Sequence, residues 1–351
     1  MNTMHFPPLL HTLRRYRTLQ TDRISALPIV ILMPHSACNC QCVMCDIWKG
    51  NQHLKQLTEK DVEGLMDSLR RLGTRQVLMS GGEALLNRNF FTLCDILKRE
   101  DIRITLLSTG LLLGRHADEI LEKVSDVIVS LDGDEAVHDR IRNIPGAFRK
   151  LKEGIRLLHS RRPDFRVTGR TVIHRLNFRS WPAIIDAARN MGLDQISFLP
   201  ADVTSEAFNR SQPWDEPRQH EILPSEEELP ELLEVLQTVI RDHAASFADG
   251  FIAESPARLL RIGEYYTAAY GRNPYPYKKC NAPWVSAVVE ADGAVRPCFF
   301  LPSFGNIREQ PLAEILNSPS AVDFRKTLDM DSNPTCVRCV CYLHLPPTAA
   351  L

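Results

Sequence analysis

The amino-acid sequence predicts an α/β fold in which a parallel sheet forms a partial barrel of six strand–helix units. Between residues 27 and 200, short apolar runs typical of buried strands alternate with longer segments of helical periodicity. Such alternation is typical of a parallel sheet covered by helices. Polar motifs follow four of the six runs, and folds of this class bind their ligands at the carboxyl ends of the strands. Six units favour an open barrel over a closed one of eight.

The individual elements follow from the same patterns. The expected strands cover residues 28–34, 76–81, 104–109, 127–132, 167–174 and 195–200. Helical periodicity predicts helices over residues 57–73, 89–101, 117–124, 147–162, 180–192 and 231–247. In the first of these helices, Thr58 is the expected N-cap and Asp61 lies in the first turn.

Composition limits the class of protein. The 351 residues have a net charge of −1, so neither nucleic acid nor an anionic membrane is expected as a partner. No apolar run reaches the length of a membrane span, and the N-terminus lacks the apolar core of a signal peptide, so we expect a cytoplasmic protein. In a reducing compartment, clustered cysteines bind metal more often than they form disulfides. Nine of the ten cysteines fall within residues 38–45 and 280–341, whereas Cys94 is expected in the core.

The most informative motif is a group of three cysteines after the first expected strand. Cys38, Cys42 and Cys45 have the spacing Cys-x3-Cys-x2-Cys, with Cys40 as an additional thiol inside the motif. Three thiolates at this spacing can hold three irons of a [4Fe-4S] cluster and leave the fourth iron open to an outside ligand. An open metal position marks a reactive site. A zinc knuckle is the alternative for the same thiols.

A Gly-Gly-Glu sequence ends the second expected strand. Gly81 and Gly82 lack a Cβ atom, so the main chain there can approach a ligand closely, and the Glu83 carboxylate can accept hydrogen bonds from an ammonium group. A simple turn is the alternative. Ser108, at the end of the third strand, is either a ligand contact or part of another turn.

Polar residues also end the fourth strand and lie on the fifth. Ser130 and Asp132 end the fourth strand, and the following Arg142 pairs either with a ligand carboxylate or with a surface acid. Arg170 and His174 lie four residues apart on the fifth strand and therefore share one face. We expect that face to line the cavity, which makes both residues candidates for catalysis.

Four further cysteines form a second group near the C-terminus. Cys280 and Cys298 flank a segment that predicts a β-hairpin turning at residues 292–293, and Cys336 and Cys339 form a Cys-x2-Cys pair. Four thiolates can fully ligate a second [4Fe-4S] cluster. A four-cysteine zinc ribbon is the alternative on spacing alone.

Together these motifs resemble the radical S-adenosylmethionine (radical SAM) superfamily. The resemblance implies a TIM-like partial (β/α)6 barrel, a [4Fe-4S] cluster on Cys38, Cys42 and Cys45, and S-adenosylmethionine chelating its open iron. Reductive cleavage of the sulfonium would then release a 5′-deoxyadenosyl radical. Contacts to S-adenosylmethionine are implied for Gly81, Gly82, Glu83, Ser108, Ser130, Asp132 and Arg142. The sequence departs from the family at Met44, where an aromatic residue often precedes the last cysteine.

The second cysteine group resembles the SPASM/twitch extension of some radical SAM enzymes. The resemblance rests on Gly293, five residues before Cys298, and on the run of residues 305–307. It implies one auxiliary [4Fe-4S] cluster, because a full SPASM domain carries more cysteines and two clusters. The implied ligands are Cys280, Cys298, Cys336 and Cys339. The expected domains are an N-terminal extension (1–26), the partial barrel (27–235), a connector (236–279) and the auxiliary domain (280–345).

Hydrogen-atom abstraction from an unactivated C–H bond is the step that the resemblance implies. An auxiliary cluster that accepts an electron would make the net reaction a two-electron oxidation. The resemblance to twitch-bearing enzymes implies oxidation or epimerisation of a small polar metabolite, such as a sugar or an aminocyclitol. An epimerase would need a hydrogen donor, for which Cys341 is a candidate. The expected electron donor is a reductase of the flavodoxin or ferredoxin type.

Two alternatives to this function stay open. The first is modification of a ribosomal peptide by a thioether, a carbon–carbon crosslink or epimerisation. The roughly 25 residues before the first strand are too few for the leader-binding module that such enzymes often carry. The second is a non-enzymatic zinc or electron-transfer protein, which would have no need of Gly81-Gly82-Glu83 at this position.

Overall fold

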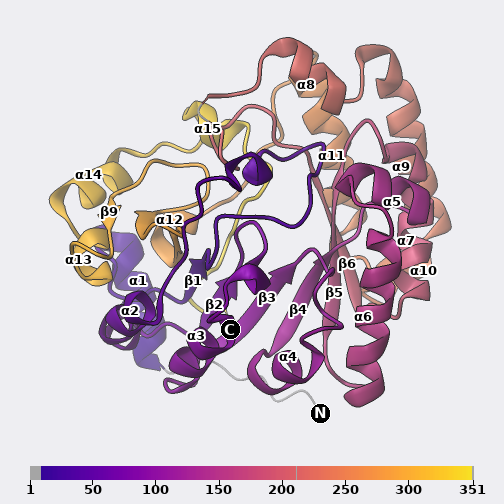
Figure 1. Ribbon diagram of the computed structural model, residues 1–351. Helices are drawn as coiled ribbons and strands as arrows, with labels where there is room; N and C mark the ends of the chain where they lie inside the picture. Colours follow the sequence, from indigo (N-terminus) through magenta and orange to yellow (C-terminus); the bar gives the residue numbers. More distant parts are fainter. Residues whose placement is uncertain (1–8, 211, 350–351) are drawn as a thin grey trace.

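A nine-stranded sheet forms the centre of the molecule in the computed structural model, which describes residues 9–210 and 212–349 (Figure 1). Six of its strands run parallel to one another in sequence order. They are β1 (Ile29–Leu32), β2 (Gln76–Met79), β3 (Arg103–Ser108), β4 (Asp126–Ser130), β5 (Val167–Ile173) and β6 (Gln195–Pro200). Each of the six overlaps its predicted run, and the predicted α/β partial barrel is confirmed.

Helices connect these strands and cover the outer face of the sheet (Figure 1). They are α2 (Glu59–Leu72), α3 (Phe90–Lys98), α4 (Ala117–Lys123), α5 (Glu135–Arg142), α6 (Ala147–Arg161) and α7 (Trp181–Asn190). Five of them lie where the periodicity predicts a helix, and α5 was not predicted. Two of the three residues that α5 buries, His138 and Arg142, are polar, so an apolar pattern does not reveal this helix.

The first of these helices shows how the local sequence sets an element. The Thr58 hydroxyl accepts a hydrogen bond from the Asp61 N–H (3.2 Å), and the Asp61 carboxylate accepts one from the Thr58 N–H (2.8 Å). This reciprocal capping box satisfies two main-chain donors at the start of α2. Gly73 ends the helix in the left-handed conformation that favours glycine. The helix buries its apolar stripe, which includes Val62, Leu65, Met66 and Leu69.

The C-terminal segment continues the barrel sheet beyond β1. Strand β7 (Ser286–Val289) pairs with β1 in parallel, and β8 (Ala294–Arg296) and β9 (Gly305–Asn306) follow antiparallel. The predicted hairpin at residues 292–293 is therefore present, and Gly293 has the positive φ of +88° that its turn requires. The pairing of β7 with β1 was not predicted. It places β7, which lies between Cys280 and Cys298 in the chain, beside the strand that leads into the first cysteine group.

The remaining helices lie beside this sheet. The segment after β6 forms α8 (Glu216–Ile222), α9 (Leu229–Asp242), α10 (Ala244–Ala248) and α11 (Pro256–Ala269). The predicted helix over residues 231–247 is thus divided between α9 and α10. The C-terminal segment adds α12 (Ala282–Val285), α13 (Leu312–Leu316), α14 (Pro319–Thr327) and α15 (Pro334–Val337), and α1 (Leu9–Thr21) precedes the sheet.

The inner face of the sheet is covered at one side and accessible at the other. Beside β1 and β7, the inner residues Ile29, Ile31 and Val288 pack against Trp284 and Leu345. On β4, β5 and β6, alternate residues remain partly or fully exposed, while the residues between them are buried against the outer helices. The accessible part of the barrel therefore lies over β4 to β6.

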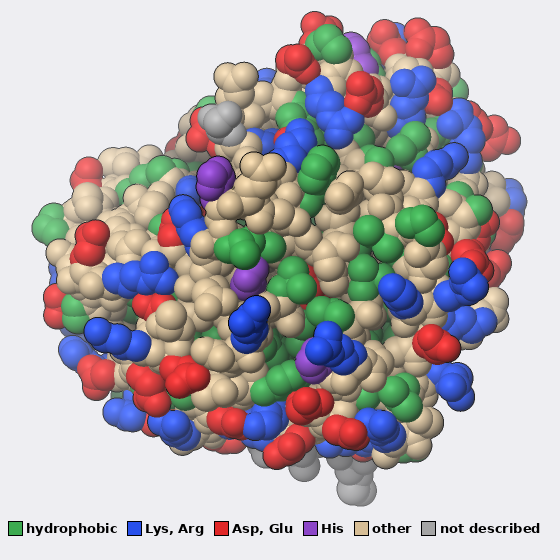
Figure 2. Space-filling model, viewed as in Figure 1, with side chains coloured by type: hydrophobic (Ala, Val, Ile, Leu, Met, Phe, Trp, Pro, Cys, Tyr) green, Lys and Arg blue, Asp and Glu red, His purple; other side chains and the backbone are tan. Residues whose placement is uncertain are grey.

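On the face shown in Figure 2, acidic and basic side chains are interspersed around the rim, so neither sign of charge dominates there. Within the described residues, none of the helices combines the length and apolar composition needed to cross a bilayer. Cys94 is fully buried in α3, as predicted.

Candidate functional site

The first cysteine group occupies a loop between β1 and α2 that is tied down from two directions. The Cys38 N–H donates to Asn51 Oδ1 (3.0 Å), and Asn51 Nδ2 donates to the Cys38 carbonyl (2.9 Å). The N–H groups of Gln41 and Val43 donate to the last carbonyls of α5, those of Arg142 (3.1 Å) and Ile141 (3.0 Å). The loop therefore docks on α5 at the carboxyl ends of the strands.

The thiols of this loop have unequal electrostatic surroundings. A hydrogen bond from the Cys40 thiol lowers the pKa of Cys42 to about 7, and the Arg142 guanidinium, 3.5 Å from the Cys42 sulfur, contributes to that shift. Burial raises the pKa of Cys45 to about 12. A bound metal deprotonates its thiol ligands outright, so these thiols are suited to a cationic metal group that replaces their protons.

Gly82 and Glu83 lie directly against the cysteine loop. A Cβ atom on Gly82 would fall 2.2 Å from the Ala37 carbonyl oxygen, so only glycine fits there. The Glu83 N–H donates to that same oxygen (2.9 Å). The sheet thus delivers the Gly81-Gly82-Glu83 motif to the side of Cys38.

The Glu83 carboxylate is fully buried among hydrogen-bond donors. It accepts from the Thr109 N–H (2.8 Å), the Thr109 hydroxyl (2.7 Å) and the Ser108 hydroxyl (3.1 Å). Burial raises the pKa of Glu83, and the hydrogen bonds from Thr109 oppose that rise. Ser108 is thus directed at Glu83 and orients it. Thr109, which no sequence motif singled out, is a further member of this site.

Asp132 and Arg142 form an ion pair above the end of β4. Arg142 Nη2 lies 2.6 Å from Asp132 Oδ2, and both side chains are almost completely buried. Burial opposes the charge on the guanidinium, but the Asp132 carboxylate outweighs it and holds the pKa of Arg142 above its usual range. The surface ion pair considered for Arg142 is excluded by this burial. The pair instead brings a fixed positive charge to Cys42.

Two histidines frame this ion pair. His138 Nδ1 accepts from the Asp132 N–H (3.2 Å), and His174 Nδ1 accepts from the Leu176 N–H (3.3 Å). Both side chains are fully buried, and within the described residues neither Nε2 atom has a hydrogen-bond partner. Burial lowers the pKa of each histidine to about 3, with the Arg142 charge adding to the effect.

These histidines predict a loss of stability in mild acid. Unfolded histidine titrates near pH 6.5. As the pH falls from about 6.5 toward 3, the unfolded chain binds protons at these residues that the folded chain does not, so the free energy of unfolding decreases. We expect His174→Asn, which keeps an acceptor near the Nδ1 position, to reduce this decrease. Anaerobic urea unfolding at about pH 7.5 and 5.5 measures it, with the exposed His53→Asn as the matched control. An unchanged difference between the two pH values in His174→Asn would contradict the assignment.

Arg170 and His174 do not share one environment, contrary to the expectation from their spacing. Strand β5 ends at Ile173, so His174 lies beyond the strand and is buried, whereas the Arg170 side chain is exposed. Arg170 stands in register with Ser130 on β4 and Ser197 on β6. These three residues form a polar row across the accessible inner face. Ser130, the last residue of β4, lies two positions before Asp132 in the chain.

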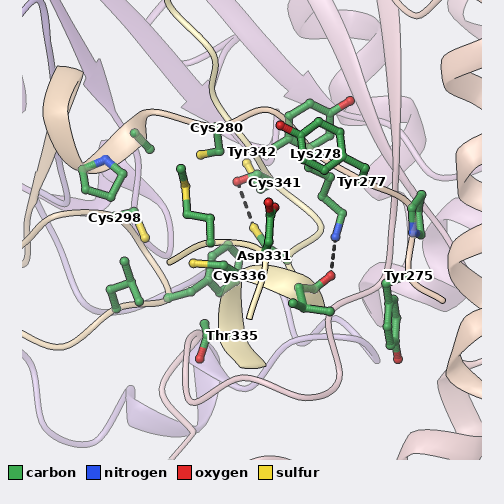
Figure 3. Close-up of a pocket in the computed structure, with 18 of the residues that line it drawn as sticks. Tyr275, Tyr277, Lys278, Cys280, Cys298, Asp331, Thr335, Cys336, Cys341 and Tyr342 are labelled. Carbon is green, nitrogen blue, oxygen red and sulfur yellow. Dashed lines mark hydrogen bonds between the residues drawn. The ribbon is translucent and has the colours of Figure 1, made fainter. Parts of the chain in front are cut away.

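The second cysteine group surrounds a cavity of about 250 Å³ (Figure 3). Cys280, Cys298, Cys336, Cys339 and Cys341 all line it, together with aromatic residues and Lys278. Burial raises the pKa of Cys298 to about 12 and that of Cys336 to about 11, and repulsion between neighbouring cysteines adds to both shifts. The Cys339 thiol donates to the carbonyl of Cys341, whose own side chain is exposed. Lys278 Nζ donates to the Val337 carbonyl at the edge of the same cavity (2.6 Å).

The number of thiols at each site is the number that an iron–sulfur cluster requires. Four thiolates on one zinc lie about 2.3 Å from the metal and therefore converge tightly. Within the described residues, no set of three or more His, Cys, Asp or Glu side chains converges in the way a single ion requires. In a cubane cluster each thiolate binds a different iron, so the sulfurs stand farther apart. Three thiols at the first site suit a [4Fe-4S] cluster with an open iron, and at least four at the second suit a fully ligated one.

Sequence comparisons agree with this assignment. The Radical SAM superfamily profile matches residues 32–188, and the profile of the SPASM iron–sulfur cluster-binding domain matches residues 280–340. The chain is 27% identical over 341 residues to the Fe-coproporphyrin III synthase of Methanosarcina barkeri, covering 89% of this chain and 80% of that protein. It is 24% identical to AlbA, the antilisterial bacteriocin subtilosin biosynthesis protein of Bacillus subtilis, over 80% of this chain and 58% of that protein.

A solved structure shows the same fold. SuiB of Streptococcus suis, bound to its precursor peptide SuiA, superimposes with a TM-score of 0.62 at 13% identity, covering 92% of this chain and 72% of SuiB. The two profile matches, the fold and the two cysteine groups lead to one conclusion: the chain belongs to the radical SAM superfamily and is a radical-based enzyme with a C-terminal SPASM domain.

Proposed function

We propose that this radical SAM enzyme oxidises a small polar metabolite that carries a carboxylate group. The observation that carries the proposal is the row of Ser130, Arg170 and Ser197 on the accessible inner face of the barrel. In the described part of the chain, the Arg170 guanidinium has one side-chain hydrogen bond, to the Ser197 hydroxyl at 3.3 Å, and no ion pair. An exposed guanidinium between two hydroxyl groups is well suited to bind a carboxylate.

Cys38, Cys42 and Cys45 would hold the cluster, which together with S-adenosylmethionine would supply the radical chemistry for removing one hydrogen atom from the substrate. The protein's part is to position the reactants. We assign Glu83, oriented by Ser108 and Thr109, to the amino group of S-adenosylmethionine, because a buried carboxylate needs a cationic partner. Asp132 and Arg142 fix the charge beside Cys42.

Completing a two-electron oxidation requires the substrate to lose one more electron and one proton. Cys280, Cys298, Cys336 and Cys339 would hold the cluster that could take up this electron, since four thiolates leave no iron open for the substrate. Glu254 is the candidate base, because it accepts a hydrogen bond from the Phe198 N–H (3.1 Å) next to Ser197. Burial raises its pKa, which favours a carboxylate that can take up a proton. A ferredoxin- or flavodoxin-type protein would supply electrons to the first cluster and collect them from the second.

Similarity to the Fe-coproporphyrin III synthase supports a substrate with acidic groups, because porphyrins of this type carry carboxylate side chains. Sugar acids and acidic aminocyclitol derivatives satisfy the same requirement. Modification of a peptide is the alternative, favoured by the similarity to AlbA and by the fold shared with SuiB.

The proposed function is tested by anaerobic turnover with S-adenosylmethionine, a reductant and three substrate classes. These are carboxylate-bearing metabolites (iron porphyrins and sugar acids), their neutral esters, and precursor peptides encoded next to the gene. We expect an acid to raise 5′-deoxyadenosine formation above the background, with one product, two hydrogens lighter, per 5′-deoxyadenosine. Turnover of a peptide alone, or of ester and acid alike, would overturn the proposal.

Changing Arg170 should weaken the use of an acidic substrate. A hydrogen-bonded charge contact contributes about 1.5–3 kcal/mol, so Arg170→Met is expected to lower kcat/KM by roughly 10- to 100-fold. Arg170→Lys should retain part of the activity, because the charge remains without the planar fork. Arg166→Met, an exposed arginine just before the same strand, is the matched control. Equal kcat/KM values for Arg170→Met and Arg166→Met would exclude Arg170 from substrate binding.

A further inference from the structure

A tryptophan outside the barrel motifs holds the cysteine loop at its far end. Trp214 lies between β6 and α8 and is buried. Its indole Nε1–H donates to Asp46 Oδ2 at 2.7 Å. Asp46 directly follows Cys45, and its other carboxylate oxygen lies 2.8 Å from Lys49 Nζ. The hydrogen bond therefore connects the segment after β6 to the residue next to a cluster ligand.

Two guanidinium groups fix the position of the indole ring. The Arg210 guanidinium lies 3.9 Å from the ring centroid and that of Arg218 lies 4.6 Å from it. Arg210 is itself held by a buried ion pair with Asp202 (2.8 Å) and by the Asp202 carbonyl (2.9 Å). Arg218 donates to the Val43 carbonyl, inside the cysteine motif. The ring is thus anchored to the end of β6 and to the loop between Cys42 and Cys45.

The residues just before Arg210 are held in an unfavourable backbone conformation. Phe208 and Asn209 have φ values of +60° and +66°, a region that costs free energy for a bulky residue such as Phe208. The Phe208 ring packs against Phe300, which lines the auxiliary cavity (6.0 Å between centroids). The Asn209 side chain sits so close to Gly50 that a Cβ there would fall 2.7 Å from its Nδ2. Contacts with both cysteine sites therefore keep this segment in place.

We propose that Trp214 is a positioning residue for the S-adenosylmethionine site. Through Asp46, it holds the backbone after Cys45 in the geometry that a cluster with an open iron requires, and it ties that geometry to the end of β6. This role is independent of the substrate and so of the proposed function. In this role Trp214 contacts no reacting atom. The indole N–H acts on the site through the hydrogen bond to Asp46.

The test is a titration of the reduced holoenzyme with S-adenosylmethionine, followed by electron paramagnetic resonance. Binding at the open iron changes the spectrum of the first cluster and leaves that of the auxiliary cluster unchanged. We expect Trp214→Phe, which keeps a ring but removes the N–H, to raise the apparent Kd at least fivefold. Trp181→Phe is the matched control, because the buried Trp181 has an indole N–H without a partner in the described residues. A Trp214→Phe protein with the Kd of Trp181→Phe would overturn the proposal.

A double-mutant cycle separates this hydrogen bond from a general loss of packing. Asp46→Ala should raise the Kd as Trp214→Phe does, and the double variant should be no worse than Asp46→Ala alone. Effects that add in the double variant would show that Trp214 does not act through Asp46 and would overturn the proposal. If Trp214→Phe fails to fold, Asp46→Ala and Asp46→Asn decide. Asparagine keeps one acceptor oxygen for the indole, so it should bind S-adenosylmethionine more tightly than the alanine variant. Equal affinities would count against the proposal.

Discussion

Replacement of Cys38, Cys42 and Cys45 by alanine is expected to abolish cleavage of S-adenosylmethionine and to leave about four irons per chain. Each thiol holds one iron of the first cluster, so no reactive open iron remains without them. The auxiliary site has its own four thiols around a separate cavity and should still load. Iron and sulfide analysis after anaerobic reconstitution, together with 5′-deoxyadenosine formation, measures both effects. We expect about eight irons in the unaltered protein, because two four-iron clusters fit the two cysteine groups.

The corresponding substitutions at the auxiliary site provide the control. Alanine at Cys280, Cys298, Cys336 and Cys339 should also leave about four irons but should preserve 5′-deoxyadenosine formation, while oxidised product is lost. Cys94→Ala, at a buried cysteine in α3, should retain both clusters. Zinc in place of iron at either site, or only four irons in the unaltered protein, would contradict the assignment of two clusters.

The second large effect is expected at the buried ion pair. Asp132→Ala leaves the Arg142 charge without its partner in an almost completely buried position. Removing one member of a buried pair costs about 3–5 kcal/mol, so the free energy of unfolding should fall by that amount. Cluster incorporation at the first site should fall with it, because the Cys42 loop rests on the last carbonyls of α5. Anaerobic urea unfolding and iron analysis measure the two losses.

Two further variants show whether the charge itself is responsible. Asp132→Leu combined with Arg142→Met should recover most of the stability, because it leaves no buried charge unpaired. Asp95→Ala removes a surface ion pair with Lys123 and should cost about 1 kcal/mol or less. A double variant as unstable as Asp132→Ala would mean that shape, and not charge, explains the loss.

The sequence predicts this fold and much of its candidate site because local patterns carry the information. Apolar runs and helical periodicity identified all six barrel strands and five helices around them. The Cys38–Cys42–Cys45 group and the Gly81–Glu83 motif each follow an expected strand directly, so the sequence predicts both at strand ends. The Gly82 contact with Ala37 gives the physical reason, since only a residue without a Cβ fits there.

Features that depend on contacts between distant residues could not be predicted. The partners of Arg142 and His174 are set by burial at the end of α5 and β5, which no local pattern reveals. Thr109 belongs to no motif, and its contact with Glu83 follows only from the pairing of the strand ends. Trp214 has no motif at all. Its role follows only from the folding of the segment after β6 back onto the cysteine loop.

The parallel pairing of β1 with β7 has a consequence for synthesis of the chain. During translation, the edge of β1 that faces away from β2 has no partner until residues 286–289 have left the ribosome. An unpaired strand edge is a template for aggregation, and contacts so distant in sequence form slowly. The loop that carries the first three cysteines follows this strand directly. The nascent barrel therefore depends on a segment that is made much later than β1. A cluster inserted before that segment is made would sit on a strand that still lacks one of its two neighbours.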